Sequence, residues 1–197
     1  MKFVSQRFPQ SKALRRLLYI IVGFAAGLAG FAGLVFGVMP AQRGPGLPLI
    51  GESVAMVGHD SRVLTSADLA GRPYLVFFGY THCSDFCPLT LAGISAVFKE
   101  LGQDKKVTAL FVTVDPETDT PEVLKTYLAN FDSRIIGLTG DPKKLDAIAE
   151  AFRVYAKGPG DFHNGVVYLM DKRGRFVSTF NLQRPPQQAA RELEHYL

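Results

Sequence analysis

The sequence predicts an α/β domain in which helices cover both faces of a central mixed sheet. Three observations support this fold class. Apolar runs of strand length alternate with segments of helical periodicity from residue 73 onward. The run 73–80, "PYLVFFGY", is apolar almost throughout, as expected of a strand that is buried on both faces of a mainly parallel sheet. The last two strand-like runs flank a short turn, which adds antiparallel strands to that sheet.

An apolar segment precedes this domain. Residues 17–39, "LLYIIVGFAAGLAGFAGLVFGVM", carry no charge over 23 positions. A helix needs about 20 such residues to cross roughly 30 Å of hydrocarbon. The core of a signal peptide is shorter, typically ~7 to 15 residues, so the segment is expected to be an uncleaved transmembrane helix rather than a removed leader.

The charges before this segment set its expected orientation. Residues 1–16 contain five basic side chains and no acidic one, which keeps the N-terminus cytoplasmic and sends the rest of the chain across the membrane. Subtracting these five from the 22 Lys and Arg leaves 17, against 18 Asp and Glu. The rest of the chain has no basic excess, so nucleic acid is not an expected partner.

Residues 40–51, "PAQRGPGLPLIG", are rich in Pro and Gly and are expected to link the membrane helix to a domain over 52–197. A bacterial periplasm is the expected compartment, with a mitochondrial inner membrane facing the intermembrane space as the equivalent. Thiols and disulfides can interconvert in such compartments. The chain has two cysteines, and a domain of this size buries a core without needing a disulfide, so both are available for chemistry.

The predicted elements of the domain begin with a hairpin of 54–57 and 62–65, followed by the strand 73–80. Pro88 suits a first helical turn, and a helix is expected to follow it with one apolar face: Leu91, Ile94, Val97, Phe98 and Leu101. The next strand is 107–114. Thr120 and Pro121 then open a helix whose predicted apolar face is Val123, Leu124, Tyr127, Leu128 and Phe131.

A strand at 134–138 comes next. Asp141 and Pro142 open another helix, with Leu145, Ile148, Ala149 and Phe152 on its apolar face. The final strand pair is 166–171 and 176–180, and a short helix from about Gln187 closes the chain.

The two cysteines stand in "THCSDFC", directly after the strand 73–80 and before the next helix. The free N–H groups and the dipole of a helix N-terminus stabilise thiolate over thiol, and thiolates attack disulfides or bind soft metals. The spacing places the second sulfur about one helical turn beyond the first, near enough to bond or to share an ion. A fixed structural disulfide is the alternative. A structural zinc site would need four ligands, and the chain has no second cysteine pair.

Among the four histidines, His163 is the candidate for a third ligand. It lies in "GPGDFHNG", immediately before the strand that begins at Val166. If that strand is the neighbour of 73–80, His163 can face the cysteines from the same edge of the sheet, and a surface position is the alternative. His59, His82 and His195 have plainer explanations in a turn, beside Cys83 and in the last helical turn.

Four segments together resemble the Sco/SenC family of membrane-anchored copper chaperones: "GYTHCSDFCPLTL", "VTVDPETDTP", "GLTG" and "FHNGVVYLMDKRG". The resemblance implies a thioredoxin-like fold and a copper site made by Cys83, Cys87 and His163. It also implies delivery of copper to, or maturation of, the dinuclear copper centre of cytochrome c oxidase. The implied partners are the oxidase subunit that carries that centre and a copper donor chaperone or a thiol reductant.

Two positions depart from the family pattern. Ser84 stands where proline usually follows the first cysteine, and Phe162 stands where an acidic residue usually precedes the histidine. Both changes bear on affinity and redox potential rather than on ligand identity. Two thiolates and an imidazole can hold both Cu(I) and Cu(II), although zinc tolerates the same ligands.

Acidic residues are the remaining candidates for a role in metal binding. The run Asp115–Asp119, "DPETD", is expected to form a loop that leads into the helix capped by Thr120. Asp85, between the cysteines, either tunes the charge of the thiolates, approaches the metal weakly, or is a solvated loop residue. The alternative function is a thiol-disulfide reductase acting on oxidase-subunit or other exported cysteines, although such enzymes generally use CxxC and a cis-proline. A peroxidase fits least, because its characteristic Thr-x-x-Cys arrangement is absent.

Overall fold

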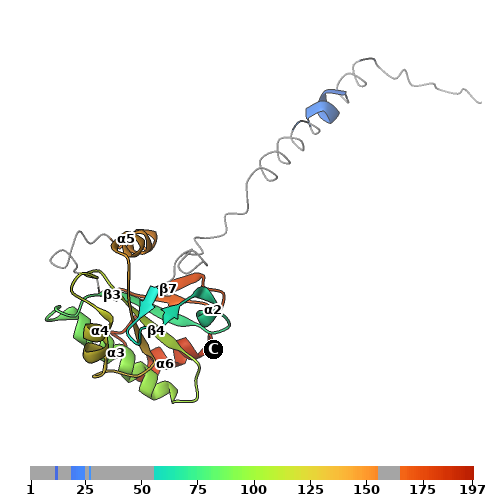
Figure 1. Ribbon diagram of the computed structural model, residues 1–197. Helices are drawn as coiled ribbons and strands as arrows, with labels where there is room; N and C mark the ends of the chain where they lie inside the picture. The colour runs from blue at the N-terminus through green and yellow to red at the C-terminus, as the bar shows by residue number, and fades with distance from the viewer. Residues whose placement is uncertain (1–11, 13–18, 25–26, 28–55, 155–164) are drawn as a thin grey trace, which may run out of the picture. The chain divides into compact units, whose positions relative to one another are not determined.

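The computed structural model describes residues 12, 19–24, 27, 56–154 and 165–197 (Figure 1). The chain divides into two compact units, 1–43 and 44–197. Residues 19–24 of the first unit are helical. No helix within the described residues is long and apolar enough to span a bilayer. Most of the predicted span 17–39 and of the basic segment 1–16, and the whole linker 40–51, lie outside the described residues.

A seven-stranded mixed sheet forms the centre of the second unit, in the order β2-β1-β5-β4-β3-β6-β7. The strands β3, β4 and β5 run parallel to one another. The β1–β2 hairpin pairs antiparallel with β5, and the β6–β7 hairpin pairs antiparallel with β3. The bounds are β1 Met56–Gly58, β2 Val63–Leu64, β3 Tyr74–Gly79, β4 Thr108–Thr113, β5 Ile135–Thr139, β6 Val167–Met170 and β7 Phe176–Phe180.

Helices alternate with the strands of this unit, as the sequence pattern predicts. Their bounds are α2 Ser66–Leu69, α3 Phe86–Leu101, α4 Pro121–Leu128, α5 Pro142–Ala151 and α6 Pro186–Glu194. Thr120 and Asp141 cap α4 and α5, because their side chains accept hydrogen bonds from the N–H groups of Val123 and Lys144. Each of these helices also has proline in its first turn, where no intrahelical N–H is needed.

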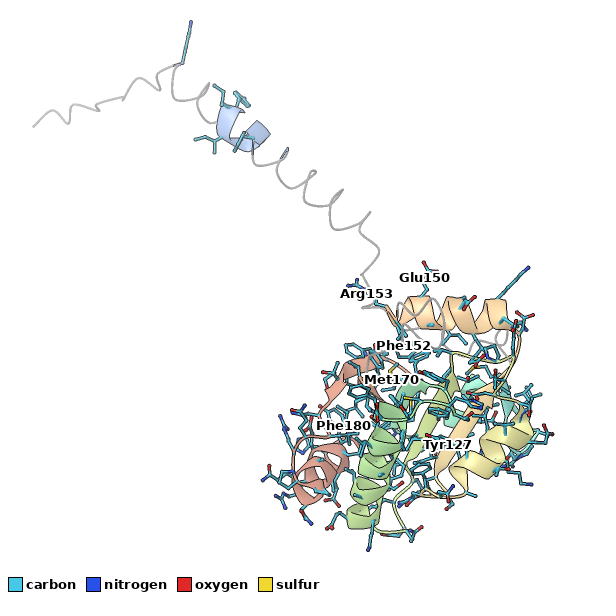
Figure 2. All side chains as sticks on the ribbon, turned by 90° about the vertical axis from the view of Figure 1, so that its left-hand side faces the viewer. Tyr127, Glu150, Phe152, Arg153, Met170 and Phe180 are labelled. Atoms are coloured by element: carbon cyan, nitrogen blue, oxygen red, sulfur yellow. The ribbon has the colours of Figure 1, made fainter. Side chains whose placement is uncertain are left out.

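Helices lie on both faces of the sheet (Figure 1), and an apolar layer fills the space on each face. Alternate residues of the central strands point to opposite faces. Leu75, Phe77 and Phe111 therefore pack with α3, α4 and α6, whereas Val76 and Phe78 pack with α5. The second layer includes the ring of Phe152, whose centroid is 5.1 Å from that of Phe78, and Met170, both labelled in Figure 2.

The structure confirms the predicted α/β class and the order of the predicted elements, with three corrections. Helix α3 begins at Phe86 rather than near Pro88, so Cys87 belongs to its first turn. Val123 is 36% exposed although the helical pattern places it on the apolar face of α4. That helix ends at Leu128, so Phe131 of the predicted face lies outside it, and the buried residues of α4 are Leu124 and Leu128. The short helix α2 was not expected.

Candidate metal centre

The thiol loop, residues 80–85, joins the carboxyl end of β3 to the first turn of α3. Both cysteines are free thiols. The backbone N–H of Cys83 donates to the carbonyl of Tyr80 at 3.3 Å, which closes a turn within the loop. The backbone N–H of Cys87 donates to the sulfur of Cys83 at 3.4 Å. The sulfur of Cys83 thus occupies the place at a helix N-terminus where a capping oxygen usually lies.

The two thiols have different environments. Cys87 is fully buried, whereas 9% of the surface of Cys83 remains exposed. Burial, together with a smaller contribution from the hydrogen bond with Cys83, raises the pKa of Cys87 to about 12. Burial also acts to raise the pKa of Cys83, but hydrogen bonds from the Cys87 thiol and from backbone N–H groups outweigh it and bring that pKa below its ordinary value. Cys83 is therefore the more nucleophilic and more accessible sulfur.

The sulfur of Cys87 packs against an apolar surface formed by Gly79 and the ring of Phe111. A β-carbon added to Gly79, the last residue of β3, would lie 2.6 Å from the ring of Phe111 and 2.9 Å from the sulfur of Cys87. Only glycine leaves room here for the sulfur to rest against the sheet. Because this apolar surface has a low dielectric constant, burial is the largest cause of the raised pKa of Cys87.

Asp119 contributes a buried carboxylate beside the thiol loop. It is 0% exposed and comes from the segment between β4 and α4. Its oxygens accept hydrogen bonds from the hydroxyls of Thr81 and Thr113, both at 2.6 Å, and from the backbone N–H of Thr81 at 3.1 Å. The interpretation of the run Asp115–Asp119 as a loop before a capped helix is correct, but it missed this contact with the thiol loop.

A sequence signal for this contact did exist. The strands β3 and β4 are parallel neighbours, so the segments that follow them meet at one edge of the sheet. Asp119 follows the second of these strands, and Thr81 follows the first. The adjacency could therefore be inferred once the two strands were paired, although the burial of the carboxylate could not.

An open pocket of about 520 Å³ lies next to the thiol loop. The loop contributes Thr81 and His82, and α4 with the residues after it contributes the rest: Glu122, Val123, Thr126, Tyr127 and Asn130. The hydroxyl of Tyr127 is buried and has no hydrogen-bond partner among the described residues. Burial, with a smaller contribution from Cys87, raises the pKa of Tyr127, so this hydroxyl stays protonated. Figure 2 labels its position.

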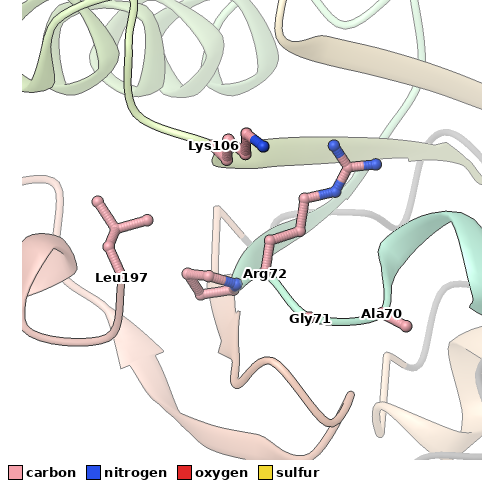
Figure 3. Close-up of a pocket in the computed structure, with 6 residues that line it drawn as sticks. Ala70, Gly71, Arg72, Lys106 and Leu197 are labelled. Atoms are coloured by element: carbon pink, nitrogen blue, oxygen red, sulfur yellow. The ribbon is translucent and has the colours of Figure 1, made fainter.

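A second pocket, of about 430 Å³, has different chemistry (Figure 3). It is lined by Ala70, Gly71, Arg72, Pro73, Lys106 and Leu197. Pro73 and Lys106 lie before β3 and β4, so this pocket is at the edge of the sheet opposite the thiols. It offers basic side chains and no soft ligand, which makes it unsuited to a copper ion.

His163 lies outside the described residues, so its distance from the thiols is not defined. Gly165 and strand β6, which come after it in the sequence, are described. Strand β6 pairs with β3, with Val167 opposite Phe77, so β6 begins near the carboxyl end of β3. A β-carbon on Gly165, two residues after His163, would lie 3.6 Å from the hydroxyl oxygen of Thr90 in α3. The condition for a histidine near the thiols, adjacent strands β3 and β6, is confirmed.

The other histidines have the expected plainer roles. Nδ1 of His59 accepts a hydrogen bond from the backbone N–H of Gly137 at 3.0 Å. His82 is exposed in the thiol loop, and His195 forms the C-cap of α6. Asp85 is exposed at the N-cap of α3 and makes no capping hydrogen bond through its side chain.

The described donor set suits a soft ion but does not by itself complete a site. No group of three or more His, Cys, Asp or Glu side chains within the described residues is arranged to hold a metal ion. Two thiols at a helix N-terminus match the ligand preference of Cu(I), and one added imidazole would give a site suited to Cu(II) as well. The thiol pair therefore fits a soft ion such as Cu(I).

Known proteins share both the sequence and the fold. The chain is 33% identical over 160 residues to "Protein SCO1 homolog, mitochondrial" of Mus musculus, an alignment that covers 76% of this chain and 56% of that protein. It is 32% identical over 149 residues to a "SCO2-like protein" of Rickettsia felis, covering 71% of this chain and 73% of the relative. The chain thus spans about half the length of the mouse relative and more of the bacterial one.

Solved structures of this group include copper-bound ones. The structure of Bradyrhizobium japonicum ScoI with copper bound is 44% identical, with a TM-score of 0.66, and the match covers 73% of this chain and 96% of that one. Yeast Sco1 with copper bound is 28% identical, with a TM-score of 0.62, covering 72% and 88%. The likeness confirms the predicted thioredoxin-like α/β fold. Since the SCO1/SenC family model also matches residues 43–197, the chain belongs to the SCO1/SenC family.

Proposed function

We propose that this protein is a membrane-tethered copper chaperone that holds copper through Cys83, Cys87 and His163. It would deliver that copper to the dinuclear copper centre of cytochrome c oxidase, or mature that centre. The observation that carries the proposal is the pair of reduced thiols at the N-terminus of α3, with the sulfur of Cys83 3.4 Å from the backbone N–H of Cys87. Copper-bound relatives of the same fold support the choice of metal.

His163 is proposed as the third ligand because of its place in the sequence relative to β6. Gly165, two residues after it, precedes β6 and lies beside Thr90 of α3, the helix that carries Cys87. Strand β6 pairs with β3, which leads into the thiol loop. An imidazole brought to the two thiolates would complete a three-ligand copper site.

The apolar segment 17–39 is proposed as the membrane tether, with the N-terminus in the cytoplasm. The uncharged length and the five preceding basic residues support this orientation. The copper-binding domain would then face the periplasm or an equivalent compartment. Its partners there would be the oxidase subunit that carries the copper centre, and a copper donor chaperone or a thiol reductant.

A reporter fusion tests the orientation. A reporter that works only after export, joined after Leu197, is expected to be active in bacterial cells. Activity of a cytoplasmic reporter at the same junction, with the exported reporter silent, would contradict the proposal.

Thiol-disulfide reduction is the second candidate function, and the asymmetry of the thiols favours it specifically. Cys83 is the more exposed sulfur and has the lowered pKa, whereas Cys87 is buried and has the raised pKa. An attacking and a resolving cysteine differ in this way. The same asymmetry is compatible with copper binding, because metal ions displace thiol protons.

The variant His163→Ala separates the two functions, because disulfide exchange needs both cysteines but no distant imidazole. We expect the variant to lose Cu(II) affinity most, by more than the ~10 to 100-fold typical of a residue that only supports a ligand. Some Cu(I) binding should remain through the two thiolates. Affinities would be measured by competition with chelators on the reduced protein, and His82→Ala is the matched control.

The outcomes are distinct. Parent-like binding of both copper states by His163→Ala, together with normal oxidase assembly in copper-limited cells, would overturn the three-ligand chaperone and favour the reductase. Cys83→Ser and Cys87→Ser cannot discriminate, because both functions need both thiols.

A further inference from the structure

The thiol loop is tied to the rest of the sheet through one carboxylate. Within the described part of the chain, the hydrogen bonds that join residues 81–85 to an element other than α3 or β3 all end on Asp119. They come from both the hydroxyl and the backbone N–H of Thr81. Because both donors of Thr81 point at one carboxylate, the backbone and the side chain of this residue are fixed together.

The other side of the carboxylate is anchored in β4. The hydroxyl of Thr113 donates to it at 2.6 Å, and that hydroxyl oxygen accepts from the backbone N–H of Asp115 at 2.9 Å. Thr113 is 1% exposed at the end of a central strand. Asp119 therefore bridges a rigid strand end and the loop that carries Cys83.

The burial of this bridge is costly. No ion pair within the described residues includes Asp119, although its side chain is fully buried. A buried carboxylate without a cation is stabilised only by its hydrogen bonds, and an isolated one would be strongly unfavourable. A loop that needed stability alone could be held by neutral or apolar contacts at lower cost. The placement beside two thiols suggests a role in their chemistry.

We propose that Asp119 is a positioning residue, acting through Thr81 to hold the sulfur of Cys83 where it can share an ion or a disulfide bond with Cys87. Thr81 precedes Cys83 by two residues, and the turn between them is closed by the hydrogen bond from the Cys83 N–H to Tyr80. A shift of Thr81 therefore moves the sulfur of Cys83 away from the first turn of α3. The copper part of this inference rests on the proposed function, whereas the disulfide part does not.

Two threonines offer a matched test, because each hydroxyl donates to Asp119 at 2.6 Å and only one belongs to the thiol loop. Thr81→Val and Thr113→Val each replace one donor to Asp119 by a group of similar size. Each also removes one further contact of the hydroxyl, with His82 in the case of Thr81 and with the Asp115 N–H in the case of Thr113. A purely structural carboxylate predicts similar consequences for both variants. The proposed positioning role predicts that only Thr81→Val changes the properties of the thiols, while both lower the stability.

The readouts are taken on the purified full chain. Cu(I) affinity is measured by chelator competition, and the sulfur-to-copper charge-transfer band reports the Cu(II) geometry. The third readout is equilibrium with glutathione, in which the two thiols give two electrons and two protons to glutathione disulfide and form the Cys83–Cys87 disulfide and two glutathione thiols. We expect Thr81→Val to weaken Cu(I) binding about 10-fold and to shift the band and the disulfide equilibrium. Thr113→Val should stay within about 2-fold of the parent.

Two further variants, Thr81→Ser and Asp119→Asn, complete the test. Thr81→Ser keeps the hydroxyl and should restore the parent values, and Asp119→Asn should exceed Thr81→Val in every readout if it folds. Equal effects of Thr81→Val and Thr113→Val, or parent-like thiol properties in Thr81→Val, would overturn the positioning role. If the parent itself binds no copper, the chaperone proposal fails, and the glutathione equilibrium still decides the role of Asp119.

Discussion

The two ends of helix α3 are built from different chemistry. At its C-terminal end, the guanidinium of Arg134 donates to the carbonyls of Phe98 and Gly102, each at 2.7 Å, and pairs with Asp132 at 2.8 Å. At its N-terminal end, Asp85 makes no capping hydrogen bond through its side chain, and the N–H of Cys87 points at a sulfur. At the C-terminal end of α3, an ion-paired arginine satisfies backbone carbonyls, whereas at the N-terminal end a thiol sulfur accepts a backbone N–H.

This difference shows how one helix combines a stable anchor with a reactive end. A helix leaves unpaired carbonyls at its C-terminus and unpaired N–H groups at its N-terminus. Satisfying the carbonyls with Arg134 fixes α3 against β5. Because the sulfur of Cys83, and not a side-chain oxygen, faces the N–H groups, their positive potential is available to a thiolate or to the sulfur ligands of a metal. The exposed side chains of Phe86 and Leu89 at this end also leave it open to a partner.

The largest expected effect comes from removing the anchor. Arg134→Ala leaves the carboxylate of Asp132 without its cation, and the Asp132 side chain is only 9% exposed. The variant also loses the stacking of the guanidinium over the Phe98 ring, 4.8 Å from its centroid. We expect the free energy of unfolding to fall by about 3 kcal/mol, measured by urea denaturation.

The control for this prediction is metal binding. Because the anchor is at the far end of α3, the folded Arg134→Ala variant should bind copper with the stoichiometry of the parent. A variant that keeps its stability but loses copper would show that the two ends are not separable in this way.

Gly79→Ala tests the reactive end by overpacking. The new β-carbon would lie 2.6 Å from the Phe111 ring and 2.9 Å from the sulfur of Cys87, so one of them must move. We expect a loss of about 2 kcal/mol in the free energy of unfolding, together with weaker Cu(I) binding. Gly137→Ala is the control, because its β-carbon would meet Leu128 at 2.6 Å in the same sheet without touching a thiol. Unchanged copper affinity in Gly79→Ala would show that the sulfur does not depend on this contact.

Acid should weaken the anchor by less than the arginine deletion does. The hydrogen bond from Arg134 holds the pKa of Asp132 below its ordinary value near 4. A lowered folded-state pKa means that the pair contributes its stability above about pH 4 and loses it as the pH falls through the folded-state pKa. Arg134 keeps its bonds to the helix carbonyls throughout. Urea midpoints between pH 6 and 2.5 should fall more steeply for the parent than for Asp132→Asn, and parallel curves would contradict the assignment.

The order of the elements could be read from the sequence because each depends on local pattern. The apolar run that contains β3 and the helical spacing of Leu91, Ile94 and Val97 are visible within a few residues. The two cysteines could be assigned to a strand-to-helix connection for the same reason. The start of α3 was misplaced because Pro88 suits any position of a first turn, and the sulfur of Cys83 takes the place of a conventional cap.

Long-range partners were much less predictable. Asp119 reaches Thr81 over 38 residues, and Arg134 reaches Phe98 over 36. Neither side chain belongs to a periodic pattern, so only the pairing of neighbouring strands brings them to their partners. The burial of the Asp119 carboxylate depends on the packed surroundings, which composition and spacing do not describe. His163 is proposed as a ligand from its place before β6, and the copper affinities of His163→Ala test that proposal.

The smallest expected effect concerns the N-cap of α3, and it tests whether the Asp85 carboxylate leaves this end uncapped. Removing a capping side chain typically costs ~1 kcal/mol. We expect Thr120→Ala and Asp141→Ala to lose about that much, because their side chains accept backbone N–H groups at 3.3 Å and 3.2 Å. Asp85→Ala should lose less than about 0.5 kcal/mol, since its carboxylate accepts no such bond and is exposed. Urea denaturation of the three variants beside the parent measures the difference. A cost for Asp85→Ala equal to that of the other two would mean that its carboxylate caps the helix in solution, and the contrast between the two ends of α3 would no longer hold.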